Sequence, residues 1–208
     1  MRTTRQAALV ALAVALLAGR ASPGFSQSVV AGTAKKALGM LVVVKSDGVE
    51  ARLQGRGALR VFDGDVLRIE GKGQALIETE EAIQVALNGN AVVKILSRWE
   101  KGQDMTRILR VQQGEVWVRS NDAQRAVEVE TPVGVLAARA AEVSVRLVSP
   151  DEAAVTVVKG TAEFSTPGSS CQLRAGTMSL GSRGKACTLP TVTDVRSITG
   201  WSHPLLTP

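Results

Sequence analysis

Between Arg107 and Phe164 the sequence alternates apolar and polar residues in short runs, and each run stops at a glycine or proline turn. A period of two is typical of β-strands that bury one face. The apolar positions in these runs are Val116, Val118, Val127, Val129, Val143, Val145, Leu147, Val155 and Val157. Strands that alternate in the same sense need one shared core. The stretch therefore predicts an all-β fold.

Turn signals recur before this stretch as well, at Asp63-Gly64-Asp65, Gly71-Lys72-Gly73 and Asn88-Gly89-Asn90. Closely spaced strands and turns favour a sandwich, barrel or β-solenoid over alternating strands and helices. The repeats resemble one another only in pattern. We therefore expect an irregular β-solenoid-like stack of short strands, with a two-sheet β-sandwich as the alternative. Asn88-Gly89 is typical of a hairpin, although the same pair can turn a corner.

The motifs of this region resemble the FecR domain, the periplasmic module of iron-uptake sigma regulators and of many exported proteins. The resemblance rests on Val111 to Val118, Val129 to Gly134, Ala138 to Val145 and Val155 to Phe164, and upstream on Leu59 to Leu96. Where the family usually has Arg-Gly-Thr, this chain has Arg139-Ala140-Ala141. The resemblance implies a FecR-like all-β protein. Because its motifs consist of valines, glycines and turns, they describe architecture better than activity.

The first 26 residues have the features of a secretory signal peptide. Arg2 and Arg5 precede an apolar run from Ala7 to Ala18, and small residues lie before Gln27. A membrane anchor is the alternative, but a spanning helix needs about 20 apolar residues. We expect the mature protein to be periplasmic or secreted, without an integral membrane segment. Residues 27–189 would form the FecR-like domain and residues 190–208 a tail, in which up to two helical turns precede a frayed end.

Charge distribution and aromatic content argue against nucleic acid as the partner. The chain has a net charge of +6, and cleavage would remove three arginines and no acid, leaving +3. The remaining charges are spread along strand faces, which is a poor nucleic-acid footprint. The chain has no tyrosine, three phenylalanines and three tryptophans, so it lacks the usual aromatic platforms for sugars and single strands. We expect the partner to be an envelope protein.

Cys171 and Cys187 are the chain's two cysteines. In an exported protein an even number of cysteines favours a disulfide. A metal pair is the alternative, but it needs further ligands, and the single histidine, His203, lies in the tail. We therefore predict a disulfide and neither a metal nor another cofactor.

No nucleophile-and-base set can be assembled around His203, because such sets need a histidine on a rigid scaffold and His203 lies in the tail. The carboxylate pairs Asp63/Asp65 and Glu80/Glu81 could in principle serve a glycosidase or lyase. An Asp-Gly-Asp sequence, however, is typical of a turn that accepts its own backbone hydrogen bonds. The sequence therefore predicts a protein that is not an enzyme and has no catalytic residues.

Trp117 is the side chain that we single out for partner contact. If Val116 and Val118 face the core, Glu115, Trp117 and Arg119 must face outward. Tryptophan and arginine often dominate interface energies. We therefore predict a contact patch of Trp117, Arg119 and Glu115, supported by Arg146. The alternative is that Trp117 packs under a loop at Ser97–Thr106.

The sequence thus favours an exported, non-catalytic FecR-like protein that acts by protein binding, envelope organisation or signalling. Two other functions stay open at this point. One is an envelope enzyme that acts on polysaccharide, and the other is a purely structural β-rod.

Overall fold

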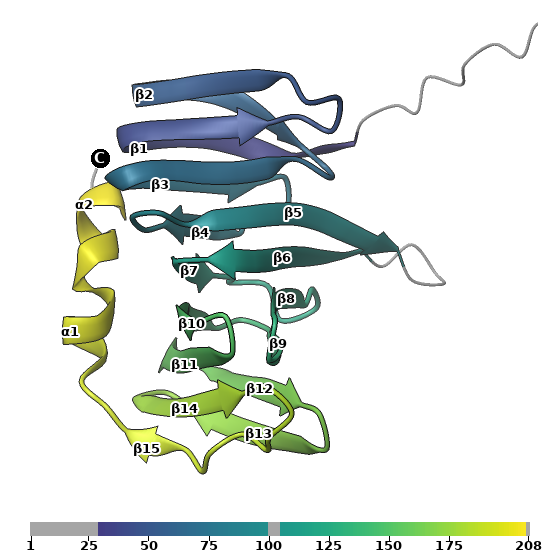
Figure 1. The fold of residues 1–208 in the computed structure, drawn as a ribbon, viewed down its shortest axis with the longest axis vertical. Coiled ribbons are helices and arrows are strands. Elements are labelled where there is room, and N and C mark those ends of the chain that lie inside the picture. The colour runs from purple at the N-terminus through teal and green to yellow at the C-terminus, as the bar shows by residue number, and fades with distance from the viewer. Residues whose placement is uncertain (1–28, 100–104, 207–208) are drawn as a thin grey trace, which may run out of the picture.

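The computed structural model describes residues 29–99 and 105–206 and forms one open, mostly antiparallel sheet of 15 strands (Figure 1). The all-β prediction is confirmed. The strands are β1 Val30–Val44, β2 Glu50–Phe62, β3 Val66–Thr79, β4 Gln84–Leu87, β5 Val92–Trp99, β6 Met105–Gln113, β7 Glu115–Arg119, β8 Val127–Thr131, β9 Gly134–Ala138, β10 Glu142–Ser149, β11 Glu152–Lys159, β12 Thr161–Thr166, β13 Ser169–Arg174, β14 Thr177–Ser182 and β15 Thr191–Val192. The helices are α1 Val195–Thr199, the short 3₁₀ helix η1 Gly200–Ser202 and α2 His203–Leu206.

Strand β3 joins two arms of this sheet. Its beginning, Val66–Arg68, pairs with β5, while Ala75–Glu78 pairs with β4. The first arm continues from β5 through β6, β8, β9 and β12 to β13, and the second from β4 through β7, β10, β11 and β14 to β15. One hydrophobic core contains residues of both arms, such as Val129 and Val145. The shared core predicted from the alternating valines is therefore present.

Glycines allow β3 to pass from one arm to the other. Gly71 has a φ of +62°, and a Cβ on Gly73 would lie 3.0 Å from the Leu38 carbonyl oxygen. A Cβ on Gly89 would lie 3.0 Å from the Gly71 carbonyl oxygen, so the Asn88–Asn90 turn also needs a glycine for close approach. Strands β4 and β5, on either side of this turn, both pair with β3 and not with each other. The hairpin interpretation of Asn88-Gly89 is wrong, and the turn makes a corner.

The strands stack along the long axis of the molecule, as Figure 1 shows. This agrees with a stack of short strands, while the two arms that enclose one core agree with the sandwich alternative. Residues 30–44 form one continuous strand, β1. The loop expected at Ser97–Thr106 is wrong at its two ends, because β5 extends to Trp99 and β6 begins at Met105. Residues 100–104 of this prediction lie outside the described residues.

A crossing segment, residues 183–188, connects β13 and β14 at the end of the molecule that these two strands form. Cys187 lies at disulfide distance from Cys171 on β13, with 6.3 Å between their Cα atoms. The Cys187 backbone N–H donates to Ser169 Oγ at 2.9 Å, and the Thr188 N–H donates to the Leu180 carbonyl on β14 at 2.9 Å. The segment therefore links β13, the last strand of the first arm, to β14 of the second arm.

The C-terminal residues 194–206 form a strap along the outside of the second arm (Figure 1). Asp194 caps α1 through a hydrogen bond from the Arg196 N–H. Helix α1 contacts β11, and α2 contacts β3 and β1, so the strap crosses the strands rather than following one of them. The predicted helical turns are present, but the predicted frayed end is wrong, because Leu205 is buried.

The expected signal peptide, residues 1–26, lies outside the described residues. Among the helices of residues 29–99 and 105–206, none has the length and apolar character needed to span a membrane.

Candidate functional site

The outer face of the second arm consists of side chains aligned in rows across β4, β7, β10 and β11. Strand register places Ala86, Trp117, Ser144 and Thr156 in one row. A row at the strand ends contains Gln84, Arg119, Glu142 and Lys159, and a row on the other side of Trp117 contains Glu115 and Arg146. Because side chains alternate along a strand, all three rows face away from the main core.

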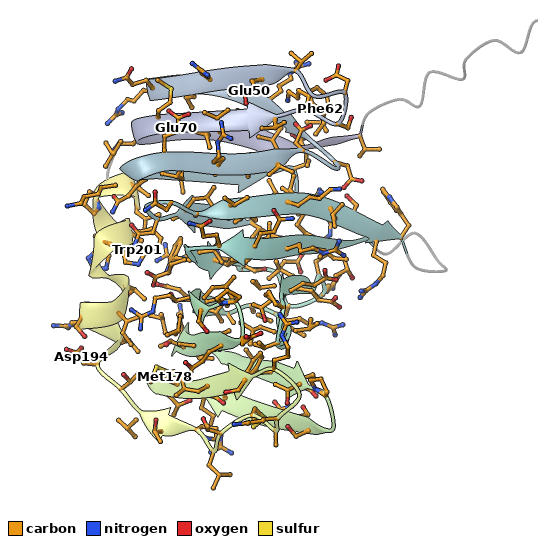
Figure 2. The ribbon with its side chains drawn as sticks, viewed as in Figure 1. Glu50, Phe62, Glu70, Met178, Asp194 and Trp201 are labelled. Atoms are coloured by element: carbon orange, nitrogen blue, oxygen red, sulfur yellow. A yellow bond between two sulfur atoms is a disulfide. The ribbon has the colours of Figure 1, made fainter. Side chains whose placement is uncertain are left out.

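Trp117 lies on this outer face, as predicted, but the strap covers it completely. Its exposed fraction is 0%, and it packs with Ala86 and Leu205 in a second hydrophobic cluster. Leu76, Trp201 and Leu206 complete this cluster. Figure 2 shows Trp201 on the strap beside the sheet. The predicted exposed contact at Trp117 is therefore wrong, and the covering element is the C-terminal strap rather than the Ser97–Thr106 segment.

Glu115 is also buried and satisfied within the protein. Its carboxylate accepts hydrogen bonds from Ser144 Oγ at 2.9 Å and from Asn88 Nδ2 at 3.2 Å. Arg146, its cross-strand neighbour, is exposed. The row of Trp117 separates Arg146 from Arg119, so the four predicted contact residues do not form one exposed patch.

Glu142 connects Trp117 to Arg119. Its carboxylate accepts from Trp117 Nε1 at 3.0 Å and from Arg119 Nε and Nη2 at 3.2 and 3.0 Å. The Arg119 guanidinium also lies over the Trp117 ring, 4.8 Å from its centroid, which adds a cation–π contact. Arg119 is thus fixed by two neighbours while part of its side chain stays in contact with solvent.

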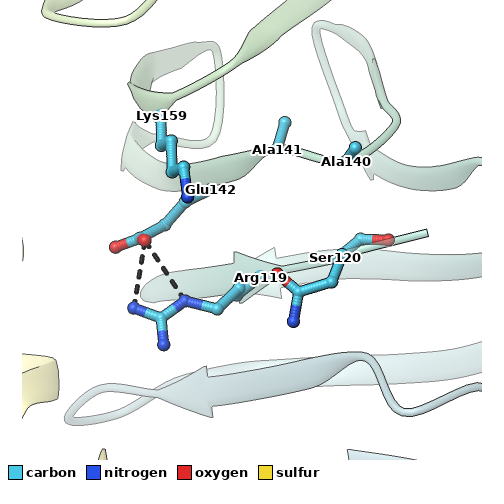
Figure 3. A pocket seen from close by; sticks show the side chains of 7 residues that line it. Arg119, Ser120, Ala140, Ala141, Glu142 and Lys159 are labelled. Atoms are coloured by element: carbon cyan, nitrogen blue, oxygen red, sulfur yellow. Dashed lines mark hydrogen bonds and ion pairs between the residues drawn. The ribbon is translucent and has the colours of Figure 1, made fainter. Parts of the chain in front are cut away.

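An open cavity of 330 Å³ lies beside this cluster. Figure 3 shows Arg119, Glu142 and Lys159 projecting from three neighbouring strands toward the same opening. Lys159 is exposed, and Ser120 and Asn121 also line the cavity. Two cations beside one carboxylate that is already paired give the cavity a local excess of positive charge. It is suited to an acidic side chain on the surface of a partner.

Ala140 and Ala141 also line this cavity and belong to the turn where the sequence departs from the family pattern. Ala140 has a φ of 44°, a left-handed backbone conformation that favours glycine. Its backbone N–H donates to the Asp122 carbonyl at 3.1 Å. The chain therefore keeps a glycine-type turn with an alanine in it.

The carboxylates considered for catalysis have structural partners. Asp65 is buried and accepts from Lys45 Nζ at 2.7 Å and from the Phe62 N–H at 2.8 Å. Asp63 accepts from Ser97 Oγ at 2.8 Å. His203 is exposed at the start of α2. The described residues contain no group of three or more histidine, cysteine or acidic side chains arranged for a metal ion.

Arg107 is a buried charge that the sequence analysis did not single out. Its guanidinium donates to both carboxylate oxygens of Glu81, at 3.1 and 2.7 Å, and to Ser97 Oγ at 2.8 Å. Its side chain is 1% exposed, and that of Glu81 is 5% exposed. The alternation of β6 places Arg107 on the same side as Leu109 and Val111, which was the available signal. Both carboxylate oxygens of Glu81 are therefore engaged in the ion pair with Arg107, so Glu81 has a structural role.

Comparison with known proteins finds one matching family model and similar solved structures. The model of the family described as FecR protein matches residues 65–163, from the start of β3 into β12. Two crystal structures of a candidate anti-sigma factor from Parabacteroides distasonis share the fold, each with a TM-score of 0.55 and with identities of 19% and 18%. The alignments cover 65% of this chain and 63% of those chains. No curated protein matches the chain.

The matched strands β3 to β11 include every strand that supplies Trp117, Arg119, Glu142 and Lys159. The β1–β2 hairpin and the strap lie outside the match. Residues 65–163 therefore match the FecR family, as the sequence motifs predicted, and the two solved structures share the fold.

Proposed function

We propose that the protein acts after export as a non-catalytic protein-binding module of the cell envelope, with a role in regulation or signalling. The FecR domain at residues 65–163 carries this proposal. The fold shared with candidate anti-sigma factors supports a regulatory role, since such proteins act through protein partners. The disulfide-distance pair Cys171/Cys187 supports an oxidising compartment.

The cavity beside Arg119 and Lys159 is the proposed contact on the second arm. The strap covers Trp117, whereas Lys159 is exposed and has no side-chain ion pair or hydrogen bond within residues 29–99 and 105–206. Arg119 is held in place by Glu142 and the Trp117 ring, so little side-chain entropy would be lost when a partner binds. Positive charge at a preorganised position favours an acidic partner surface.

Capture from native envelope extract tests this proposal. The tagged mature protein should retain a reproducible protein partner, and Lys159→Glu should reduce the amount retained about tenfold, because reversal places a second negative group beside Glu142. Arg174→Glu, an exposed reversal on β13, is the matched control and should leave capture unchanged. Equal capture by wild type and Lys159→Glu would place the partner elsewhere. A protein found intact in the cytoplasm with its first 26 residues would contradict export.

A further inference from the structure

The two ends of the molecule differ in how their edge strands are covered. At one end β15 contains only two residues, and the crossing segment 183–188 joins β13 to β14 through Cys187 and Thr188. At the other end β2 contains 13 residues and pairs with β1 alone. Figure 2 shows Glu50 and Phe62, the two ends of β2, at the top of the molecule. No described strand pairs with the outer edge of β2, and side chains satisfy it only at its end, where the Arg60 carbonyl accepts from Lys45 Nζ and the Phe62 N–H donates to Asp65 Oδ2, each at 2.8 Å.

The side chains of β2 divide into a basic outer face and an apolar inner face. Three exposed arginines of β2, Arg52, Arg56 and Arg60, lie opposite β1 residues Val42, Lys36 and Thr33 in the strand register. Their neighbours Leu53 and Leu59 pair with Leu41 and Ala34 and pack against the main core. The edge therefore presents arginines on one side and partly buried leucines on the other.

Charge is concentrated at this end of the molecule. Residues 30–62 contain six basic and two acidic side chains, whereas residues 63–208 contain 16 basic and 17 acidic ones. Arg52 is paired with Glu50 at 3.2 Å. Arg56 and Arg60 have no side-chain ion pair or hydrogen bond to any other part of the described chain. The excess positive charge of the expected mature chain thus lies on the β1–β2 hairpin.

We propose that the β2 edge binds an extended acidic segment of another protein by strand addition. The added strand would take up the outer backbone hydrogen bonds of β2 that Lys45 and Asp65 leave open, with acidic side chains beside Arg56 and Arg60 and apolar ones beside Leu53 and Leu59. A second copy of this chain is a poor occupant. Antiparallel pairing of two β2 strands would bring their arginines together on one face, and like charges on neighbouring strands are destabilising.

The probe is a labelled nine-residue peptide that alternates glutamate and valine, with fluorescence anisotropy as the readout of binding to the intact mature protein. A lysine–valine peptide of the same length controls for charge, and a glutamate–valine peptide N-methylated at alternate residues controls for strand pairing. We expect the acidic peptide to bind at least tenfold more tightly than the basic one. N-methylation on the pairing edge should abolish binding, and raised salt should weaken it.

The double variant Arg56→Glu/Arg60→Glu should weaken binding of the acidic peptide at least tenfold. Arg174→Glu/Lys185→Glu, two exposed reversals at the covered end, should have no such effect. Amide exchange of residues 50–62 should slow in the complex. Three results would overturn the proposal: no binding of the acidic peptide, equal binding of acidic and basic peptides, or undiminished binding of the N-methylated peptide. The first would mean that the arginines only keep other strands away from the edge. None of these results bears on the cavity at Lys159, which lies on the other part of the sheet.

Discussion

Ala140 adopts a backbone conformation that its Cβ disfavours. With a φ of 44°, it lies in the left-handed region, where an L-residue other than glycine costs about 1–2 kcal/mol. Glycine would remove this cost but would lose about 0.4–1 kcal/mol through the larger entropy of its unfolded state. We therefore expect Ala140→Gly to raise the free energy of unfolding by about 0.5–1 kcal/mol, measured by urea denaturation.

Ala137→Gly is the matched control for this substitution. Ala137 lies in β9 and pairs with Glu128 and Glu163, and its φ is not positive. Glycine inside a strand should destabilise by about 0.5–1 kcal/mol. If both substitutions lower stability equally, Ala140 is not strained and the left-handed turn is absent in solution.

The sequence predicted that Trp117 contacts a partner, whereas the structure buries it in a hydrophobic cluster under the strap. Trp117→Ala would leave a cavity among Ala86, Leu205 and Trp201, and we expect a loss of about 3–5 kcal/mol in the free energy of unfolding. Trp99→Ala, which removes a side chain that is 61% exposed, should change stability by less than about 0.5 kcal/mol. Chemical denaturation of both variants provides the measurement. A small effect at Trp117 would mean that the strap does not pack on it.

The sequence predicted the direction of Trp117 correctly but not its cover. Alternation along β7 places Val116 and Val118 in the main core and Trp117 on the opposite face, because the period of a strand is a local property. What lies on that opposite face depends on residues almost 90 positions later in the chain. The tail shows only a weak helical pattern, with Val195, Ile198 and Trp201 on one side, and this does not reveal which surface it contacts.

At the scale of elements, the strap is the part of the molecule that determines which surface is available. Its helices are each shorter than a stable isolated helix, so their order depends on packing against the sheet. Leu205 is 2% exposed, and Leu205→Ala should lower the free energy of unfolding by about 2–5 kcal/mol. Leu189→Ala is the control, since Leu189 is 85% exposed and should contribute little. Equal effects on the unfolding midpoint would contradict a packed strap.

The crossing segment 183–188 stabilises the opposite end through Cys171 and Cys187. A disulfide between cysteines 16 positions apart contributes about 3 kcal/mol to the free energy of unfolding in the chain-entropy model. Cys171→Ser/Cys187→Ser should therefore lower the melting temperature to that of the reduced wild type. Addition of reductant should affect the wild type alone. Two thiols titrated in the wild-type protein purified under oxidising conditions would disprove the bond.

The arrangement of β3, β4 and β5 shows where element-level reasoning from sequence stops. The sequence Asn88-Gly89 is compatible with a hairpin and with a corner between two strands, because both need a tight turn. The choice depends on β3, whose two halves pair with different strands. Which strands pair with each other is a non-local property of the chain. The same property decides between a stack of strands and a sandwich. The strands themselves were predictable, because valine alternation and glycine turns are encoded locally.

At the scale of the whole molecule, the structure separates a covered face from two exposed basic regions. The strap closes the outer face of the second arm over Trp117, while Lys159 at its rim and Arg60 on the β2 edge are exposed. Protein binding through these exposed regions, and not through Trp117, is the central functional claim.

Site-specific photo-crosslinking in the native envelope tests this claim most directly. A photoreactive amino acid would replace Lys159 or Arg60 in the exposed regions, Ser144 in the buried row under the strap, or Arg174 on β13 as an exposed control. We expect protein adducts from position 159 or position 60 and none from positions 144 and 174. Adducts from position 144 with none from positions 159 and 60 would show that partners bind the face under the strap. That result would contradict the account.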